Sequence, residues 1–200
     1  MRLPVYGNPT EIINENGELD TIDHRIAEFE LINEHGESFS SEQLDSTIYV
    51  AAFFFTRCPS ICPRMTSQMV RLQLKMDNDA FEDIRFVMHT VDPRNDSAEV
   101  LLKYEEEKYL DKERTILLTG TQEDIYRLGV QSYLLASQED IDAPGGFLHS
   151  EKFVLIDRQG RIRGFYDGTN TEEVDRLADE IKLLMKEEAI NEYNREKSES

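Results

Sequence analysis

The sequence predicts an α/β fold in which helices cover a central sheet. The continuous apolar run at residues 48–56 and the largely apolar run at 84–91 have the length of strands that are buried on both faces. A helix-start signal follows each of these runs. Two further strand-like runs, at residues 152–157 and 161–166, flank a turn signal and predict an antiparallel pair. Strands that alternate with helices are typical of the α/β class.

The N-terminal part of the chain predicts a leader followed by a β-hairpin. Residues 1–25 are polar and contain two prolines and two glycines, which is typical of an extended leader. The turn signal at residues 33–36 lies between Phe29 and Leu31 on one side and Phe39 on the other. Apolar residues on both sides of such a turn predict a hairpin.

The run at residues 48–56 predicts the central strand, and a helix follows it. Pro63 fits the first helical position, where its missing N–H costs nothing. The core-facing side of this helix is predicted from apolar residues at helical spacing: Met65, Met69, Leu72 and Met76. After the strand at 84–91, Asp96 lies three residues before Glu99. This spacing resembles a capping box that opens a helix through Tyr109.

The C-terminal half predicts the remaining elements. Strands are predicted at residues 115–118, 152–157 and 161–166. Thr121 is predicted to cap a short helix that ends before Gly129, and Thr171 to cap the last helix. Residues 189–200 are predicted to form a polar, frayed tail. The order of elements indicates one domain at residues 26–188, with a thioredoxin-like fold: a central mixed sheet, an added N-terminal hairpin and flanking helices.

The charge balance limits the class of partner. The chain has 22 basic and 41 acidic residues and a net charge of −19. Such a surface repels nucleic acid and anionic lipid and attracts cations and basic proteins, so we expect no nucleic-acid partner. The longest apolar run, Ile48–Phe55, is too short to cross a membrane, and no signal-peptide core follows Met1. Read literally this is a cytosolic chain, but a start placed after a removed anchor is an equal alternative.

The two cysteines, Cys58 and Cys62, are separated by three residues at the junction of the central strand and its helix. Backbone N–H groups and the helix dipole favour thiolate there. Over one helical turn the two sulfurs can converge to form a disulfide or to share a metal. We expect both thiols to lie within disulfide reach of each other and to face solvent. A structural disulfide that closes so short a loop constrains the unfolded chain only weakly, so redox chemistry or metal binding is the better interpretation.

A site that also holds Cu(II) needs a third ligand, and imidazole suits it. Among the four histidines, His24 and His35 lie in leader and turn contexts and are predicted to be solvated. His89 lies within a strand and is predicted to be a satisfied core histidine. His149 follows the loop at residues 143–148 and opens the strand that precedes the final hairpin turn. In a thioredoxin-like sheet, that loop approaches the cysteine-bearing helix, so position alone makes His149 a candidate and leaves its assignment open.

Several segments resemble the SCO/SenC family. Residues 53–63, FFFTRCPSICP, resemble its active-site segment with C-x-x-x-C-P after an aromatic strand. Residues 91–97, VDPRNDS, resemble its V-D-P-x-x-D-T segment, with Ser97 in place of threonine. Residues 148–160, LHSEKFVLIDRQG, resemble its histidine segment. With the hairpin near residue 30, the resemblance covers residues 26–188.

The resemblance implies one copper ion per chain, held by Cys58, Cys62 and His149. It also implies a role in building the binuclear copper centre of cytochrome c oxidase. The chain would act as a copper metallochaperone that delivers copper to the copper-centre subunit, or as a reductase of that centre's cysteines, with a copper donor or a thioredoxin-like reductant as a further partner. The implied location is the periplasmic face of the cytoplasmic membrane, with the anchor removed. Asp92 and Asp96 are candidates to orient the site, although Asp96 fits a helix cap equally well.

Three alternatives remain open from the residues. The first is a metal-independent thiol–disulfide oxidoreductase acting on exported proteins, although the C-x-x-x-C spacing differs from the thioredoxin C-x-x-C and no proline immediately precedes the hairpin. The second is a peroxidase, which needs an upstream proline and threonine; Thr56 is present and the proline is absent. The third is a zinc site, because two thiolates, one imidazole and a water also satisfy Zn²⁺.

Overall fold

The computed structural model describes residues 2–13, 17–135 and 150–199. Its centre is a mixed sheet whose strands are, in chain order, β3 (Glu30–Asn33), β4 (Ser38–Ser40), β5 (Tyr49–Phe54), β6 (Arg85–Thr90), β7 (Thr115–Thr119), β8 (Lys152–Ile156) and β9 (Ile162–Asp167). Their spatial order is β4-β3-β7-β6-β5-β8-β9. The central strands β5, β6 and β7 run parallel, whereas β3 and β8 join them antiparallel. The structure therefore contains the predicted strands and the predicted hairpin β3–β4.

The apolar run at residues 48–56 forms the middle of this sheet. All six residues of β5 are buried. β5 pairs with β6 along its whole length, from Tyr49 opposite Arg85 to Phe54 opposite Thr90. Parallel strands end at the same edge of a sheet. The segment after β5, which carries the cysteines, and the segment after β6 therefore start side by side.

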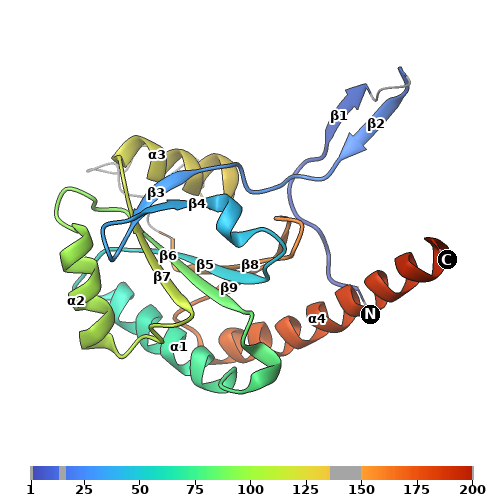
Figure 1. Ribbon diagram of the computed structural model, residues 1–200. Helices are drawn as coiled ribbons and strands as arrows, with labels where there is room; N and C mark the ends of the chain where they lie inside the picture. Colours follow the sequence, from blue (N-terminus) through green and yellow to red (C-terminus); the bar gives the residue numbers. More distant parts are fainter. Residues whose placement is uncertain (1, 14–16, 136–149, 200) are drawn as a thin grey trace.

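Helices cover the sheet on both faces (Figure 1). One face is covered by α1 (Ile61–Lys75), α2 (Ala98–Lys108) and α4 (Thr171–Glu199). The other face is covered by α3 (Gln122–Arg127) and the π-helical turn η3 (Leu128–Ser132). Two short 3₁₀ turns are η1 (Ser41–Leu44) and η2 (Asp79–Phe81). Of the helices in the described ranges, none is long and apolar enough to span a membrane.

The side chains that helical spacing predicts to face the core are buried. Those of α1 and α4 are each at most 1% exposed: Met65, Met69, Leu72, Met76, Leu177, Ile181 and Leu184. The methionines of α1 are therefore core residues, as predicted. The mixed sheet, the order of elements and this packing agree with the predicted thioredoxin-like fold.

Helix caps are confirmed in one case and corrected in two. The Thr121 side chain caps α3 as predicted. The cap of α2 is Ser97, not Asp96, because Asp96 is fully buried and bonded elsewhere. At the start of α4, the side chain of Asn170 accepts hydrogen bonds from the first turn, whereas Thr171 is already helical.

Both ends of the chain differ from the prediction. The leader contains an antiparallel hairpin, β1 (Thr10–Ile13) and β2 (Leu19–Ile22), which projects from the domain in Figure 1. Leu3 is buried in the core, so part of the leader also packs on the domain. The tail after residue 189 continues α4 to Glu199 instead of fraying. Its many Glu, Lys and Arg residues are good helix formers, which explains why a polar sequence stays helical.

Candidate metal and thiol site

The two cysteines lie at the junction of β5 and α1, as predicted. β5 ends at Phe54, and the chain turns through residues 55–60 before α1 begins at Ile61. Cys58 lies in this turn, and Cys62 is the second residue of the helix. Pro63 is therefore the third helical residue rather than the first. It still lies in the first turn, where the backbone N–H has no partner within the helix.

The start of α1 brings the two side chains together. The backbone N–H of Cys62 donates to Sγ of Cys58 over 3.4 Å. Backbone N–H groups of Ser60 and Ile61 also favour the thiolate form of Cys58. Both cysteines line one cavity of about 470 Å³. A thiol pair that opens into one cavity can form a disulfide or bind one soft metal ion.

The two thiols have opposite pKa shifts. At Cys58, partial burial acts to raise the pKa, but the N–H groups of Cys62, Ser60 and Ile61 outweigh it, so the pKa of Cys58 lies below its ordinary value. At Cys62, burial raises the pKa to about 12. The direct interaction of the two thiols lowers the pKa of Cys58 and raises that of Cys62. Cys58 is therefore the better nucleophile of the pair.

The expectation that both thiols face solvent is wrong for Cys62. Cys58 is partly exposed, whereas Cys62 is only 5% exposed. Cys62 lies one helical turn before Met65, on the side of α1 that packs into the core. An incoming group therefore meets Cys58 first, and Cys62 lies deeper in the cavity wall.

Part of the cavity wall comes from residues on either side of the segment 136–149. Leu135 and Ser150 both line the cavity. The predicted ligand His149 lies outside the described residues, as does the loop at 143–148. Within the described part of the chain, no three His, Cys, Asp or Glu side chains are grouped so that they would hold a metal ion. The assignment of His149 therefore stays a prediction, and Ser150, its neighbour in the chain, lines the same cavity as the cysteines.

The predictions for the other histidines are largely confirmed. His35 is exposed and lies 3.3 Å from Glu34. His24 is only partly exposed, because Nε2 lies 2.8 Å from the backbone oxygen of Ser132. His89 is fully buried in β6, and its ring stacks on Phe53 with 4.8 Å between centroids. Its place in the core confirms one part of the prediction, but the expected full set of hydrogen bonds is not found in the described part of the chain.

Only one of the two ring nitrogens of the buried His89 has a hydrogen-bond partner among the described residues. Nε2 lies 3.3 Å from the hydroxyl of Tyr133, and Nδ1 has no hydrogen-bond partner in the described ranges. Burial lowers the pKa of His89 to about 3, from an ordinary value of 6.5. The folded protein therefore holds this imidazole neutral over a pH range in which the unfolded chain protonates it.

We expect His89 to destabilise the protein in mild acid. The unfolded state binds the proton below pH 6.5 and the folded state only near pH 3, so stability falls as the pH drops through this window. Between pH 7 and pH 5 the loss from this residue is about 2 kcal/mol. Urea unfolding of wild type, His89→Phe and the exposed control His35→Ala measures it at both pH values. An equally steep loss in His89→Phe would contradict the prediction.

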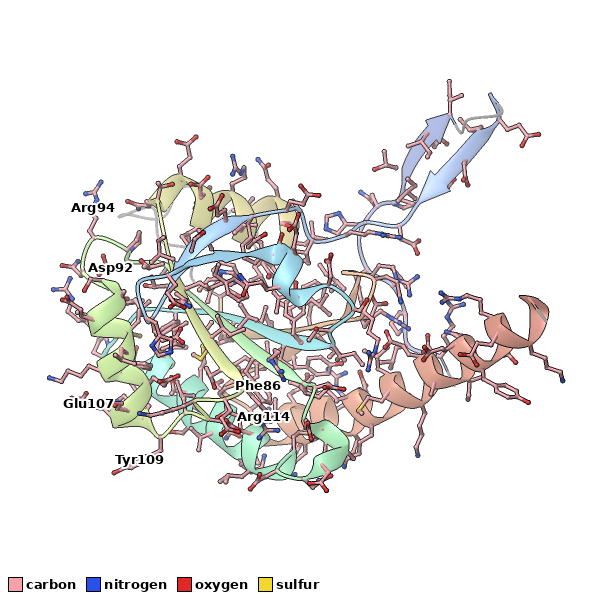
Figure 2. The ribbon with its side chains drawn as sticks, in the orientation of Figure 1. Phe86, Asp92, Arg94, Glu107, Tyr109 and Arg114 are labelled. Atoms are coloured by element: carbon pink, nitrogen blue, oxygen red, sulfur yellow. The ribbon has the colours of Figure 1, made fainter. Side chains whose placement is uncertain are left out.

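Two carboxylates reach the turn that carries Cys58 from the segment after β6. Asp92 accepts a hydrogen bond from Arg57 over 3.2 Å, and Asp96 accepts two from Thr56. Figure 2 shows Asp92 next to the start of α2, with Arg94 pointing away from the domain. The sequence predicted both carboxylates as candidates to orient the site. It missed Thr56 as the partner of Asp96 and Arg57 as the partner of Asp92, because only the parallel pairing of β5 and β6 brings these segments together.

Comparison with known proteins agrees with the fold and with the family resemblance of the sequence. The SCO1/SenC family model matches residues 18–186. A SCO1/SenC family lipoprotein from Bacillus anthracis is 30% identical, with a TM-score of 0.70 over 81% of this chain and 95% of that one. BsSco, described with a disulfide switch and as a member of the Sco family of cytochrome c oxidase assembly proteins, is 30% identical, with a TM-score of 0.66 over 78% and 91%. Arabidopsis thaliana ScoI, solved with copper bound, shares the fold at 24% identity and a TM-score of 0.65 over 80% and 98%.

Proposed function

This chain belongs to the SCO1/SenC family, and we propose that it binds one copper ion through Cys58, Cys62 and His149 and serves the assembly of the binuclear copper centre of cytochrome c oxidase. The observation that carries the proposal is the pair of thiols in one cavity at the junction of β5 and α1. The copper bound to the Arabidopsis relative supports the choice of metal. The description of BsSco as a member of an oxidase assembly family supports the role.

The residues present fit copper. Thiolates are soft ligands that select Cu(I), and the amides around Cys58 favour its thiolate form. The Cys62 thiol must lose its proton when the metal binds, so copper binding releases protons. We assign the third position to His149, because Ser150 lines the cavity and imidazole suits both oxidation states. The bound ion is the cargo that the domain delivers to the acceptor thiols.

The unequal exposure of the two thiols supports a reductase role for the same site. The Cys58 thiolate attacks a disulfide of the acceptor, forms a mixed disulfide and releases one acceptor thiolate, which takes up a proton. Cys62 then loses its proton and attacks Sγ of Cys58, which forms the Cys58–Cys62 disulfide and releases the second acceptor thiol. Two electrons pass to the acceptor. A thioredoxin-like dithiol is the reductant that restores the pair.

The proposed acceptor is the subunit that carries the binuclear copper centre, because its copper ligands include the cysteines that both roles require. We place the domain at the periplasmic face of the cytoplasmic membrane. The support for this location is that the Bacillus anthracis relative is a lipoprotein. A copper donor protein on the same side of the membrane would load the site.

Copper binding and disulfide formation are expected to exclude one another. A disulfide consumes both thiolates, so the reduced protein should bind one Cu(I) per chain and the oxidised protein none. The test is an anaerobic titration of each form against a chromophoric Cu(I) chelator, with free thiols counted in parallel. Zn²⁺ is titrated in the same way as a comparison.

The outcomes separate the proposed function from its alternatives. Full copper occupancy in a protein with no free thiol would contradict the site. A reduced protein that binds no copper but exchanges disulfides would favour the metal-independent oxidoreductase acting on exported proteins. Tighter binding of Zn²⁺ than of Cu(I) would favour a zinc site.

A further inference from the structure

Asp96 is a buried carboxylate that holds the start of the cysteine turn. Its side chain is fully buried. It accepts hydrogen bonds from the backbone N–H of Thr56 over 3.1 Å, from the hydroxyl of Thr56 over 2.5 Å and from the hydroxyl of Thr90 over 2.5 Å. A buried charge is costly unless hydrogen bonds satisfy it. The three donors come from the ends of two strands, so this carboxylate connects the segments at the ends of β5 and β6 through hydrogen bonds.

A second carboxylate, that of Asp92, connects the same two segments one residue further along the chain, at Arg57. The N–H of Asp92 donates to the hydroxyl of Thr90 over 3.1 Å. The Asp92 carboxylate accepts from Arg57 and from the amide of Asn95. Thr56 and Arg57, the two residues that directly precede Cys58, are thus both held by the segment after β6. Of the two contacts, the one to Thr56 is buried more deeply, because the Arg57 side chain is 63% exposed.

We propose that Asp96 is the positioning residue of the thiol site, which fixes Thr56 and thereby holds Sγ of Cys58 close to Cys62. The expected change in Cu(I) affinity rests on the proposed function, whereas the expected redox change does not. Thr56 is two residues from Cys58, and the helix holds Cys62 in place. A fixed turn keeps the two sulfurs at a high effective concentration, which favours every state in which they bond to each other or to one metal ion.

The proposal predicts the direction of a redox change. In the metal-free protein, the dithiol reacts with glutathione disulfide to give the Cys58–Cys62 disulfide and two molecules of glutathione, with two electrons passing to glutathione. In Asp96→Asn, which keeps the size of the side chain, we expect the equilibrium constant of this reaction to fall about tenfold, which corresponds to a reduction potential about 30 mV higher. Cu(I) affinity should fall by about tenfold as well.

Matched variants separate positioning from general destabilisation. Ser97→Ala removes the neighbouring cap of α2 without touching Thr56. It should lower the free energy of unfolding and leave the glutathione equilibrium unchanged. Thr56→Val removes one hydroxyl donor to Asp96 at the same volume and should shift the equilibrium in the same direction as Asp96→Asn. Thr56→Ser keeps that hydroxyl and should behave like wild type.

Each outcome decides the proposal. If Asp96→Asn shifts the glutathione equilibrium no more than Ser97→Ala does, Asp96 is only a structural residue and the proposal is wrong. If Asp96→Asn does not fold, the difference between Thr56→Val and Thr56→Ser supports the proposal, and its absence overturns it. A wild-type protein that binds no copper while the redox shift persists would remove the proposed function and leave the positioning role of Asp96 intact.

Discussion

Replacing Cys58 with serine is expected to lower Cu(I) affinity by roughly a thousandfold or more and to abolish disulfide exchange, because a hydroxyl is a hard, neutral donor and a weak nucleophile. Cys58 is the thiol that an incoming group meets first, and its sulfur accepts a hydrogen bond from the backbone N–H of Cys62. Cys62 is buried, so it does not replace Cys58 as the attacking thiol. The measurement is a chelator competition for Cu(I), together with the rate of reaction with glutathione disulfide.

Cys62→Ser should show a different pattern. It should lose copper to a similar extent, because one thiolate is again missing. Cys58 remains able to attack a disulfide, but no second thiol resolves the product, so a mixed disulfide with glutathione should accumulate. Mass spectrometry after brief exposure to glutathione disulfide detects this adduct as the mass of one bound glutathione.

The control for both variants is Ser60→Ala, in the same turn. Ser60 is exposed, and its side chain makes no capping hydrogen bond to α1. It should keep both copper binding and disulfide exchange. Wild-type copper affinity in Cys58→Ser would mean that the metal is held elsewhere. An equal adduct yield in Cys58→Ser and Cys62→Ser would mean that the assignment of the attacking thiol is wrong.

Local pattern was enough to predict the place of the thiol site. The run at 48–56 is continuous and apolar, and only a strand buried on both faces suits such a run. The methionines of α1 repeat at helical spacing, so the core-facing side of this helix follows from the sequence. What spacing alone did not give is the difference in exposure between the two thiols, which depends on packing against the core.

Asp96 shows why other features of the fold and the site could not be predicted from the sequence. A carboxylate three residues before Glu99 has the local pattern of a helix cap, and Ser97 competes for the same role one residue later. Asp96 is bonded instead to Thr56, 40 residues away. Long-range contacts of this kind leave no periodic signal in the sequence. The hairpin β1–β2 and the helical end of α4 were missed for another reason, since few of their residues are buried and their apolar pattern is weak.

His149→Ala is expected to weaken Cu(II) binding by about a hundredfold while changing Cu(I) affinity by less than about tenfold, because Cu(I) is satisfied by two thiolates whereas Cu(II) prefers nitrogen and a higher coordination number. The thiol pair that would retain Cu(I) is the one that the structure places in a single cavity. Loss of the imidazole should also let Cu(II) oxidise the thiolates, so two equivalents of added Cu(II) should be reduced to Cu(I) and should form the Cys58–Cys62 disulfide faster in the variant.

The experiment titrates His149→Ala with each oxidation state separately and records the electronic and paramagnetic resonance spectra of the Cu(II) form. His35→Ala is the matched control, since His35 is exposed and lies in the turn between β3 and β4. It should keep the wild-type affinity and spectrum. If His149→Ala also keeps both, His149 is not a ligand. The third donor would then have to be sought elsewhere, because the described residues bring no third His, Cys, Asp or Glu to the two thiols.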